Sequence, residues 1–155
     1  MSRVWEDDRI IRVNMTEQSI SIEPFPQELK LLGGRALSAR ILSKECAPQC
    51  DPLGPDNVLV LAPGVLSGTV APTSGRISVG CKSPLTGGIK EANAGGEAGA
   101  DLMRLGYRLI IVTGQPADSD RRWGLEVTGA RHDGDSRASG DDGGVPLFAK
   151  LGRRD

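Results

Sequence analysis

The chain has 155 residues, and its 20 acidic and 19 basic side chains nearly cancel. This length suffices for one hydrophobic core, and the balanced charge provides no overall field that would attract nucleic acid or an anionic membrane. Only five residues are aromatic, so few side chains are available to stack on the bases of single-stranded nucleic acid. We therefore expect a protein that binds neither nucleic acid nor membrane.

The N-terminus and the cysteines both indicate a cytoplasmic protein. The opening segment MSRVWEDDRI lacks the apolar run of a signal peptide, and no later apolar stretch approaches the ~20 residues that span a bilayer. Cys46, Cys50 and Cys81 are too few and too unevenly spaced for a disulfide framework. This cysteine usage fits a reducing compartment.

The first elements predicted along the chain are a hairpin and a helix. Residues 9–15 and 19–25 are β-rich runs joined by a short polar turn, which is typical of a hairpin. Apolar residues then recur at spacings of three and four over residues 29–46, as on one face of a helix. Gly33 and Gly34 would weaken this helix. The pair therefore predicts that a strand or a ligand approaches the backbone closely there.

The middle of the chain alternates short strands, loops and one helix. Residues 57–62 form an apolar run typical of a buried strand, residues 63–76 a long loop of small and polar residues, and residues 77–81 a second strand. Residues 95–106 predict a helix that ends at a glycine, and residues 108–113 a core strand. Because the regular βαβ rhythm is missing, we expect an α+β fold, a mostly antiparallel sheet covered by helices.

The composition changes near the C-terminal end. Residues 123–128 predict one more strand, whereas residues 132–144 are polar and glycine-rich and predict a flexible segment. Residues 145–155 predict one short helical turn, which needs docking to be stable. We therefore divide the chain into a base, residues 1–115, and a divergent or flexible tail, residues 116–155.

Arg76 and Asn93 are predicted to meet at one end of the sheet. If strand 77–81 pairs with the next run in a hairpin, both residues come to the same end. Arg76 would provide a permanent charge and a fork suited to phosphate or to the polar edge of a heterocycle. Gly95 and Gly96 leave backbone N–H groups unshielded before the predicted helix, whose N-terminus favours phosphate. Asn93 offers a side-chain amide, or its backbone carbonyl to Mg²⁺.

Two alternatives stay open on residue types alone. Glycine-rich turns before helices are common, so tight turns and an exposed Arg76 also explain the pattern without a ligand. Arg35, which follows the glycine pair, either reaches the site or forms a surface ion pair.

Other polar residues carry weaker signals. Cys46 and Cys50 have a CxxxC spacing without a second pair or a neighbouring histidine, which argues against an iron–sulfur or zinc site. His132, the only histidine, lies in the polar tail and is interpreted as a solvated loop residue. Glu91 and Glu97 are interpreted as surface carboxylates near a helix start.

Seven sequence blocks follow one another between residues 9 and 114. They are RIIRVNM, LLGGRALSARIL, DPLGPDNVLVLAPGVLSGT, APTSGR, KSPLTGG, ANAGG and RLGYRLIIVTG. Taken together, this part of the chain resembles the N-terminal domain of the aldehyde ferredoxin oxidoreductase family, the tungstopterin enzymes. Several blocks in the same order and spacing are far more specific than a single glycine motif.

The resemblance implies that the base, residues 1–115, is a partial N-terminal domain on which a bis-pterin cofactor sits. In this family two pterin dithiolenes hold tungsten, as tungstopterin, or molybdenum, as molybdopterin, and Mg²⁺ bridges their phosphates. The resemblance implies that Arg76, Asn93, Ala94 and Gly95 contact the pterin or its phosphates. It also makes the backbone carbonyl of Asn93 a candidate Mg²⁺ ligand. No catalytic residue is assigned to this chain.

The implied reaction is the oxidation of an aldehyde to a carboxylate, with electrons leaving through an iron–sulfur cluster to ferredoxin. The ligands of that cluster have no counterpart in this sequence, so we expect an incomplete enzyme whose remaining domains lie on another chain or on a larger homologous subunit. The chain would then be a cofactor-binding fragment or subunit. The alternatives are a stand-alone module that binds pterin or another phosphate ligand, and a non-catalytic remnant that acts as a partner surface.

Overall fold

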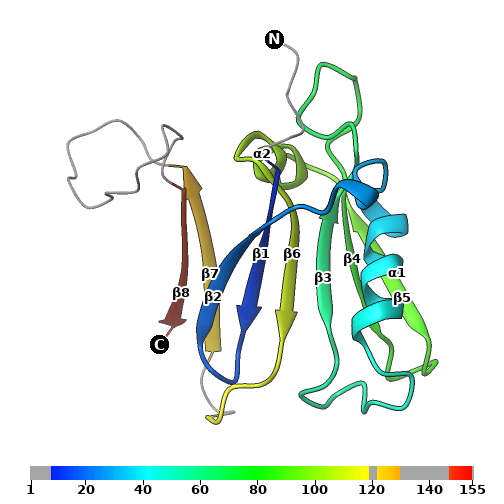
Figure 1. The fold of residues 1–155 in the computed structure, drawn as a ribbon, viewed down its shortest axis with the longest axis vertical. Coiled ribbons are helices and arrows are strands. Elements are labelled where there is room, and N and C mark those ends of the chain that lie inside the picture. Colours follow the sequence, from blue (N-terminus) through cyan, green and yellow to red (C-terminus); the bar gives the residue numbers. More distant parts are fainter. Residues whose placement is uncertain (1–7, 119–121, 130–146, 155) are drawn as a thin grey trace.

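The computed structural model describes residues 8–118, 122–129 and 147–154. Its main feature is a six-stranded sheet with the strand order β2-β1-β6-β3-β4-β5 (Figure 1). The strands are β1 (Arg9–Asn14), β2 (Ser19–Pro24), β3 (Leu59–Pro63), β4 (Ile77–Lys82), β5 (Ile89–Ala94) and β6 (Tyr107–Thr113). Within this sheet β1 and β6 are parallel, and the other neighbouring pairs are antiparallel. The predicted α+β class with a mostly antiparallel sheet is confirmed.

Two helices cover the sheet from opposite faces. Helix α1 (Gly34–Glu45) packs on β3 and β4, and helix α2 (Ala98–Arg104) packs on β3 and β6. Because side chains alternate along a strand, Ile10 faces the α1 side with Leu37, whereas Ile11 faces the α2 side with Leu102. Two separate hydrophobic clusters result, one on each face. In the described part of the chain, no helix has the length and apolar character needed to cross a membrane.

Helix α1 begins later than the apolar periodicity predicts. The residues before it form a short 3-10 helix, η2 (Gln27–Leu29), and the α-helix starts only at Gly34, whose φ is +53°. A Cβ atom on Gly33 would lie 2.5 Å from the backbone nitrogen of Val65. The glycine pair therefore marks the helix start. A close approach exists there as predicted, but the loop after β3 makes it and not a strand or a ligand.

The second sheet is a two-stranded ribbon of β7 (Arg122–Gly129) and β8 (Leu147–Arg154). Strand β7 confirms the strand predicted near the C-terminal end, but β8 shows that the predicted terminal helical turn is wrong. β8 pairs with β7 over its whole length, and this ladder satisfies backbone groups that one isolated turn leaves open. The predicted flexible segment, residues 132–144, lies outside the described residues.

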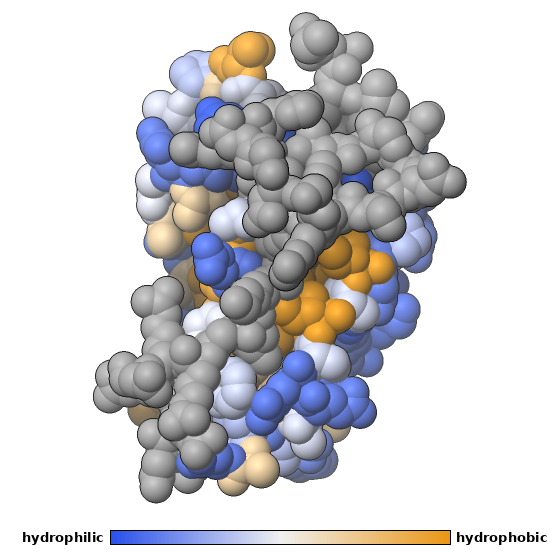
Figure 2. Space-filling model, turned by 90° about the vertical axis from the view of Figure 1, so that its left-hand side faces the viewer, coloured by the Kyte–Doolittle hydropathy of each residue, from blue (hydrophilic) through white to orange (hydrophobic). Residues whose placement is uncertain are grey.

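The ribbon side of the molecule carries a band of apolar residues. Figure 1 places β7 and β8 beside β2, and Leu125 and Val127 of β7 pack against the cluster on the α2 side. Figure 2 looks at this side and shows apolar residues gathered in the middle, with hydrophilic residues above and below. The ribbon therefore extends the hydrophobic cluster beyond the main sheet.

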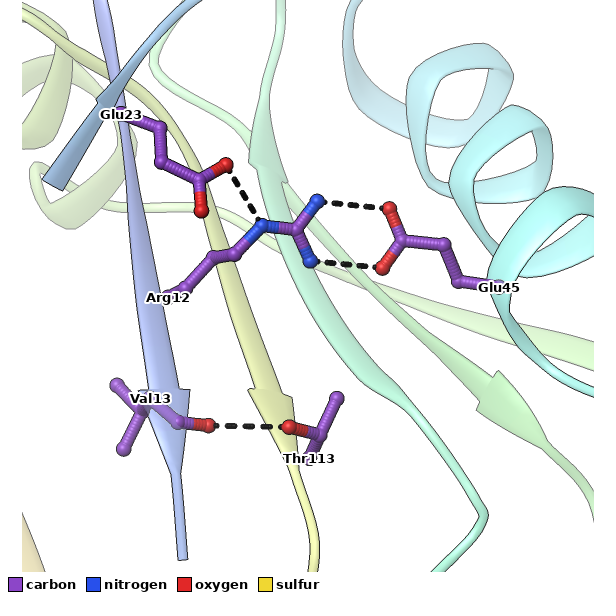
Figure 3. Close-up of polar contacts among 5 residues, drawn as sticks. All are labelled: Arg12, Val13, Glu23, Glu45 and Thr113. Atoms are coloured by element: carbon purple, nitrogen blue, oxygen red, sulfur yellow. Dashed lines mark hydrogen bonds and ion pairs between the residues drawn. The ribbon is translucent and has the colours of Figure 1, made fainter. Parts of the chain in front are cut away.

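An ion-pair cluster joins β1 to the end of α1 (Figure 3). Arg12 on β1 donates from Nη1 and Nη2 to the two carboxylate oxygens of Glu45, at 2.8 Å each, and from Nε to Glu23 at 2.8 Å. The hydrogen bonds to Glu45 raise the pKa of the Arg12 guanidinium further above its ordinary value. A carboxylate in the last turn opposes the helix dipole. Arg12 offsets this effect and holds the end of α1 over the sheet.

Candidate functional site

The β4–β5 hairpin brings Arg76 and Asn93 together. In its antiparallel register Ile77 is opposite Ala94 and Ser78 is opposite Asn93, and Arg76 directly precedes β4. The Arg76 Nε atom donates a hydrogen bond to Asn93 Oδ1. The predicted meeting of these two residues at one sheet end is confirmed, while their role stays a prediction.

Strand β5 extends further than the sequence pattern indicates. Asn93 and Ala94 lie within it rather than in a loop, because the pairing with β4 continues over six residue pairs. β5 is also an edge strand, so alternate backbone N–H and C=O groups point away from β4. Arg76, Asn93, Ala94 and Gly95 are all exposed. Their polar groups are therefore accessible to a ligand.

Gly95 lies directly beside the guanidinium of Arg76. A Cβ atom on Gly95 would be 3.6 Å from Arg76 Nη1, so a side chain there would occupy the space next to the charge. The predicted helix start at Gly95 is wrong, because α2 begins at Ala98 and has only seven residues. The positive charge beside Gly95 therefore comes from the Arg76 guanidinium.

The backbone of Arg76 is enclosed by the loop between β3 and β4 on one side and by α2 on the other. The hydroxyl of the fully buried Ser67 donates to the Ser74 carbonyl at 2.5 Å and lies 3.3 Å from the Arg76 carbonyl. The Gly64 N–H also donates to the Arg76 carbonyl, at 3.2 Å. On the other side, a Cβ atom on Gly99 would lie 3.0 Å from the same oxygen. The exposed guanidinium thus projects from a rigid backbone.

Glu91 is a site residue that the sequence analysis misses. Its side chain is only 9% exposed, and its Oε1 accepts hydrogen bonds from Ser78 Oγ at 2.7 Å and from Asn93 Nδ2 at 3.4 Å. The pKa of Glu91 is lowered, chiefly by the Ser78 hydrogen bond. The interpretation as a surface carboxylate is therefore wrong. The signal in the sequence is its i, i+2 spacing from Asn93, which puts both on one face of a strand.

Arg35, in the first turn of α1, forms an ion pair with Glu91. Its Nε and Nη2 atoms lie 3.1 Å and 3.0 Å from Glu91 Oε2, and its side chain is 78% exposed. Of the two alternatives left open by the sequence, an ion pair is observed, in which only Arg35 is exposed. Because Glu91 also contacts Asn93, this ion pair links Arg35 to the site. Four side chains therefore form one chain of contacts, in the order Arg35, Glu91, Asn93 and Arg76.

Arg35, Glu91, Asn93 and Arg76, with Ala94 and Gly95 beside them, form a surface that we call the Arg76 patch. The remaining candidate residues lie away from it. Cys46 and Cys50 are near Lys82, at the opposite end of β4 from Arg76. Among the residues described here, no three His, Cys, Asp or Glu side chains are grouped as a metal site would require. His132 lies outside the described residues. The contacts that link Arg35, Glu91, Asn93 and Arg76 therefore lie apart from these cysteines.

The similarity of this chain to known proteins agrees with the fold. The family model for the aldehyde ferredoxin oxidoreductase N-terminal domain matches residues 10–129. The chain belongs to the aldehyde ferredoxin oxidoreductase family. The matched region includes β7 and the six strands of the main sheet, apart from Arg9 at the start of β1. The expected boundary between the base, residues 1–115, and the tail, residues 116–155, stays a prediction.

Individual relatives cover the same part of the chain. The tungsten-containing aldehyde ferredoxin oxidoreductases of Pyrococcus furiosus and Thermococcus kodakarensis are 50% and 48% identical to it over 109 residues. That region is 69% of this chain and 18% of each relative, so the chain spans a small part of the curated relatives it matches. A WOR-like subunit of an aliphatic sulfonate oxidoreductase from P. furiosus is 30% identical over 112 residues.

A solved structure shares the fold. The active-site complex BamBC of benzoyl coenzyme A reductase, in complex with 1,5-dienoyl-CoA, superposes with a TM-score of 0.70 and 31% sequence identity. The similarity covers 75% of this chain and 18% of that chain. The sheet-and-helix architecture is therefore shared with much longer members of the same group.

Proposed function

We propose that this chain is the base on which a tungsten or molybdenum bis-pterin cofactor binds, in an aldehyde-oxidising enzyme of the aldehyde ferredoxin oxidoreductase family. The observation that carries the proposal is the hydrogen bond between Arg76 and Asn93 beside Gly95, in a chain about half identical to tungsten-containing relatives. The matched region covers 18% of those relatives, so the proposal concerns the cofactor-binding part of such an enzyme.

The residues of the patch fit an anionic pterin with its phosphates. Arg76 carries a permanent charge on an exposed guanidinium, of which only Nε is used by Asn93. A guanidinium can hold a phosphate or a heterocycle edge through two parallel hydrogen bonds. Gly95 leaves space beside Arg76 Nη1 that any other side chain would fill. The cofactor would therefore approach the backbone at Ala94 and Gly95 and contact the guanidinium.

Asn93 would have two functions in this arrangement. Its side chain is held between Arg76 and Glu91, so its Oδ1 atom orients the guanidinium. Its backbone carbonyl lies on the edge strand β5 and is the proposed ligand for Mg²⁺, which prefers oxygen ligands and neutralises phosphates. Glu91 and Arg35 would act as positioning residues. Glu91 contacts Asn93, and Arg35 acts through Glu91, whereas neither would contact the proposed cofactor directly.

When bound, the cofactor would supply the two-electron oxidation of an aldehyde to a carboxylate, with electrons passing through an iron–sulfur cluster to ferredoxin. The residues of this chain would bind and orient the cofactor and neutralise part of its negative charge. We propose a cytoplasmic site for the reaction, since the cysteine usage fits a reducing compartment.

The test is analysis of metal and pterin in the protein purified from its native host, with co-purifying chains identified by mass spectrometry. We expect tungsten or molybdenum together with pterin and a larger partner chain. Arg76→Ala should lower the bound pterin at least about tenfold, as the loss of a charged contact worth ~1.5–3 kcal/mol would do. Arg104→Ala is the matched control, since Arg104 pairs with Asp101 on α2, and it should retain the cofactor.

Other outcomes would redirect the proposal. Pterin bound to this chain without a partner would support the stand-alone binding module. A purified chain with neither metal nor pterin, or an Arg76→Ala variant with unchanged pterin content, would contradict cofactor binding at this patch.

A further inference from the structure

The end of α1 that is remote from the patch carries two cysteines in contact. Cys46 is the residue that caps the C-terminus of α1, and Cys50 follows it after a turn closed by the hydrogen bond from the Cys50 N–H to the Ala47 carbonyl, at 3.0 Å. The two Sγ atoms are 3.3 Å apart. A disulfide bond is about 2.05 Å long. Small side-chain rotations would therefore bring the two sulfur atoms to bonding distance.

Buried polar groups hold this turn in place. The ammonium of Lys82, a residue that is 8% exposed, donates to the carbonyl of Cys50 at 2.7 Å and to the carbonyl of Pro48. Asn57 donates from Nδ2 to the carbonyl of Pro52 at 2.6 Å. The thiols thus meet on a preorganised backbone, and preorganisation lowers the entropy that a ring closure costs.

The two thiols differ in accessibility. Cys46 is partly exposed, whereas Cys50 is buried, and burial raises the pKa of the Cys50 thiol. The thiolate is the reactive form of a cysteine. Cys46 is therefore the thiol that a reagent from solvent meets first, and Cys50 is placed behind it as the resolving thiol.

We propose that Cys46 and Cys50 are a redox modification site that forms a reversible intramolecular disulfide by exchange with a small-molecule disulfide. The Cys46 thiolate attacks one sulfur of that reagent, which forms a mixed disulfide and releases one thiolate. Cys50 then loses its proton and attacks the Cys46 sulfur, which releases the second thiolate. Two protein thiols are oxidised and one small disulfide is reduced to two thiols. The site is independent of the proposed cofactor patch.

The geometry favours a disulfide over a metal site. In the ranges that the structure describes, no third Cys, His, Asp or Glu joins the pair in a group that could hold a metal ion. Zinc and iron–sulfur sites use four protein ligands or three with an open position. In a reducing compartment the disulfide would be transient and would respond to changes in the thiol pool.

The experiment oxidises the full chain with oxidised glutathione and then identifies the free thiols by alkylation and peptide mass spectrometry. We expect the wild type to lose two of its three thiols and to yield a Cys46–Cys50 disulfide peptide, with Cys81 still reduced. Cys81→Ser, which leaves the pair intact, is the matched control and should give the same disulfide. Because these two proteins keep both thiols of the pair, the test does not depend on a variant that fails to fold.

A second variant separates the two steps. In the Cys50→Ser variant the reaction should stop at the mixed disulfide between glutathione and Cys46. This mixed disulfide should persist at least about tenfold longer than in the wild type, where Cys50 resolves it. A stable glutathione adduct at Cys46 in the wild type would overturn the proposal. Oxidation of Cys81 at the same rate as Cys46, or a disulfide that includes Cys81, would overturn it as well.

Discussion

The carboxylate of Glu91 accepts a 2.7 Å hydrogen bond from the hydroxyl of Ser78, its diagonal neighbour across β4 and β5. Ser78 is fully buried, so the bond forms on the side of the hairpin that α1 covers. The same carboxylate binds Arg35 at the start of α1 and Asn93 at the end of β5. One acidic side chain therefore joins the helix, the hairpin and the Arg76 patch.

Replacing Glu91 with glutamine should make the stability difference from the wild type depend on pH. Because the folded-state pKa of Glu91 is lowered, its contribution is present above the pKa of the unfolded chain and is lost as the pH falls through the folded-state value. Urea unfolding should therefore show Glu91→Gln less stable than the wild type at neutral pH, with a difference that shrinks in acid. Glu97→Gln, at an exposed residue outside this network, should differ little at any pH.

A difference between Glu91→Gln and the wild type that stays constant from neutral to acid pH would contradict this account. Such a result would mean that shape and not charge explains the contribution of Glu91.

The Arg12–Glu45 pair should show measurable coupling in a double-mutant cycle. Both side chains are mostly buried, with 32% and 23% exposed, and the contact uses two parallel hydrogen bonds. We expect a coupling energy of about 1–2 kcal/mol from urea unfolding of Arg12→Ala, Glu45→Ala and the double variant. The Arg104–Asp101 pair, with 61% and 56% exposed, is the control and should couple by only ~0.3–0.5 kcal/mol. Equal coupling in both cycles would contradict the role assigned to Arg12.

Gly33→Ala, at the residue that precedes α1, should destabilise the fold. The added Cβ atom would lie 2.5 Å from the backbone nitrogen of Val65, so the helix start and the loop after β3 must separate. We expect a loss of about 1–3 kcal/mol in thermal or urea unfolding. The control is Gly88→Ala, where the nearest atom would be 3.9 Å away, and it should change stability by less than ~0.5 kcal/mol. A neutral Gly33→Ala variant would rule out the close contact.

Asn57→Ala should be more harmful than Asn14→Ala. Asn57 accepts from the N–H groups of Val58 and Lys82 at 2.8 Å and 3.1 Å, and donates to the carbonyls of Pro52 and Lys82. Its loss leaves several partly buried backbone groups without partners, which should cost about 2–3 kcal/mol. The Asn14 side chain accepts hydrogen bonds from the N–H groups of Thr16 and Glu17, which are exposed. Water can replace it there, so its loss should cost less than ~1 kcal/mol. The comparison requires only urea unfolding, and a reversed order would contradict it.

Much of the site follows from local patterns in the sequence. Two strands joined by a short turn must run antiparallel, so the residue before the first strand and the residue near the end of the second come together. That rule is sufficient to bring Arg76 to Asn93. It does not reveal Glu91 as a partner, because whether a carboxylate on a strand faces solvent or a helix depends on where α1 packs.

The sequence by itself determined the α+β class, β7, the main-sheet strands other than the full length of β5, and the convergence of Arg76 with Asn93, because these depend on side-chain periodicity and on residues close in the chain. Only the tertiary structure decided the start of α1, the strand conformation of β8 and the contact between Cys46 and Cys50. The helix start depends on Val65, β8 depends on its pairing with β7, and the cysteine turn depends on Lys82. Each of these contacts joins segments distant in the sequence, and local periodicity carries no information about such contacts.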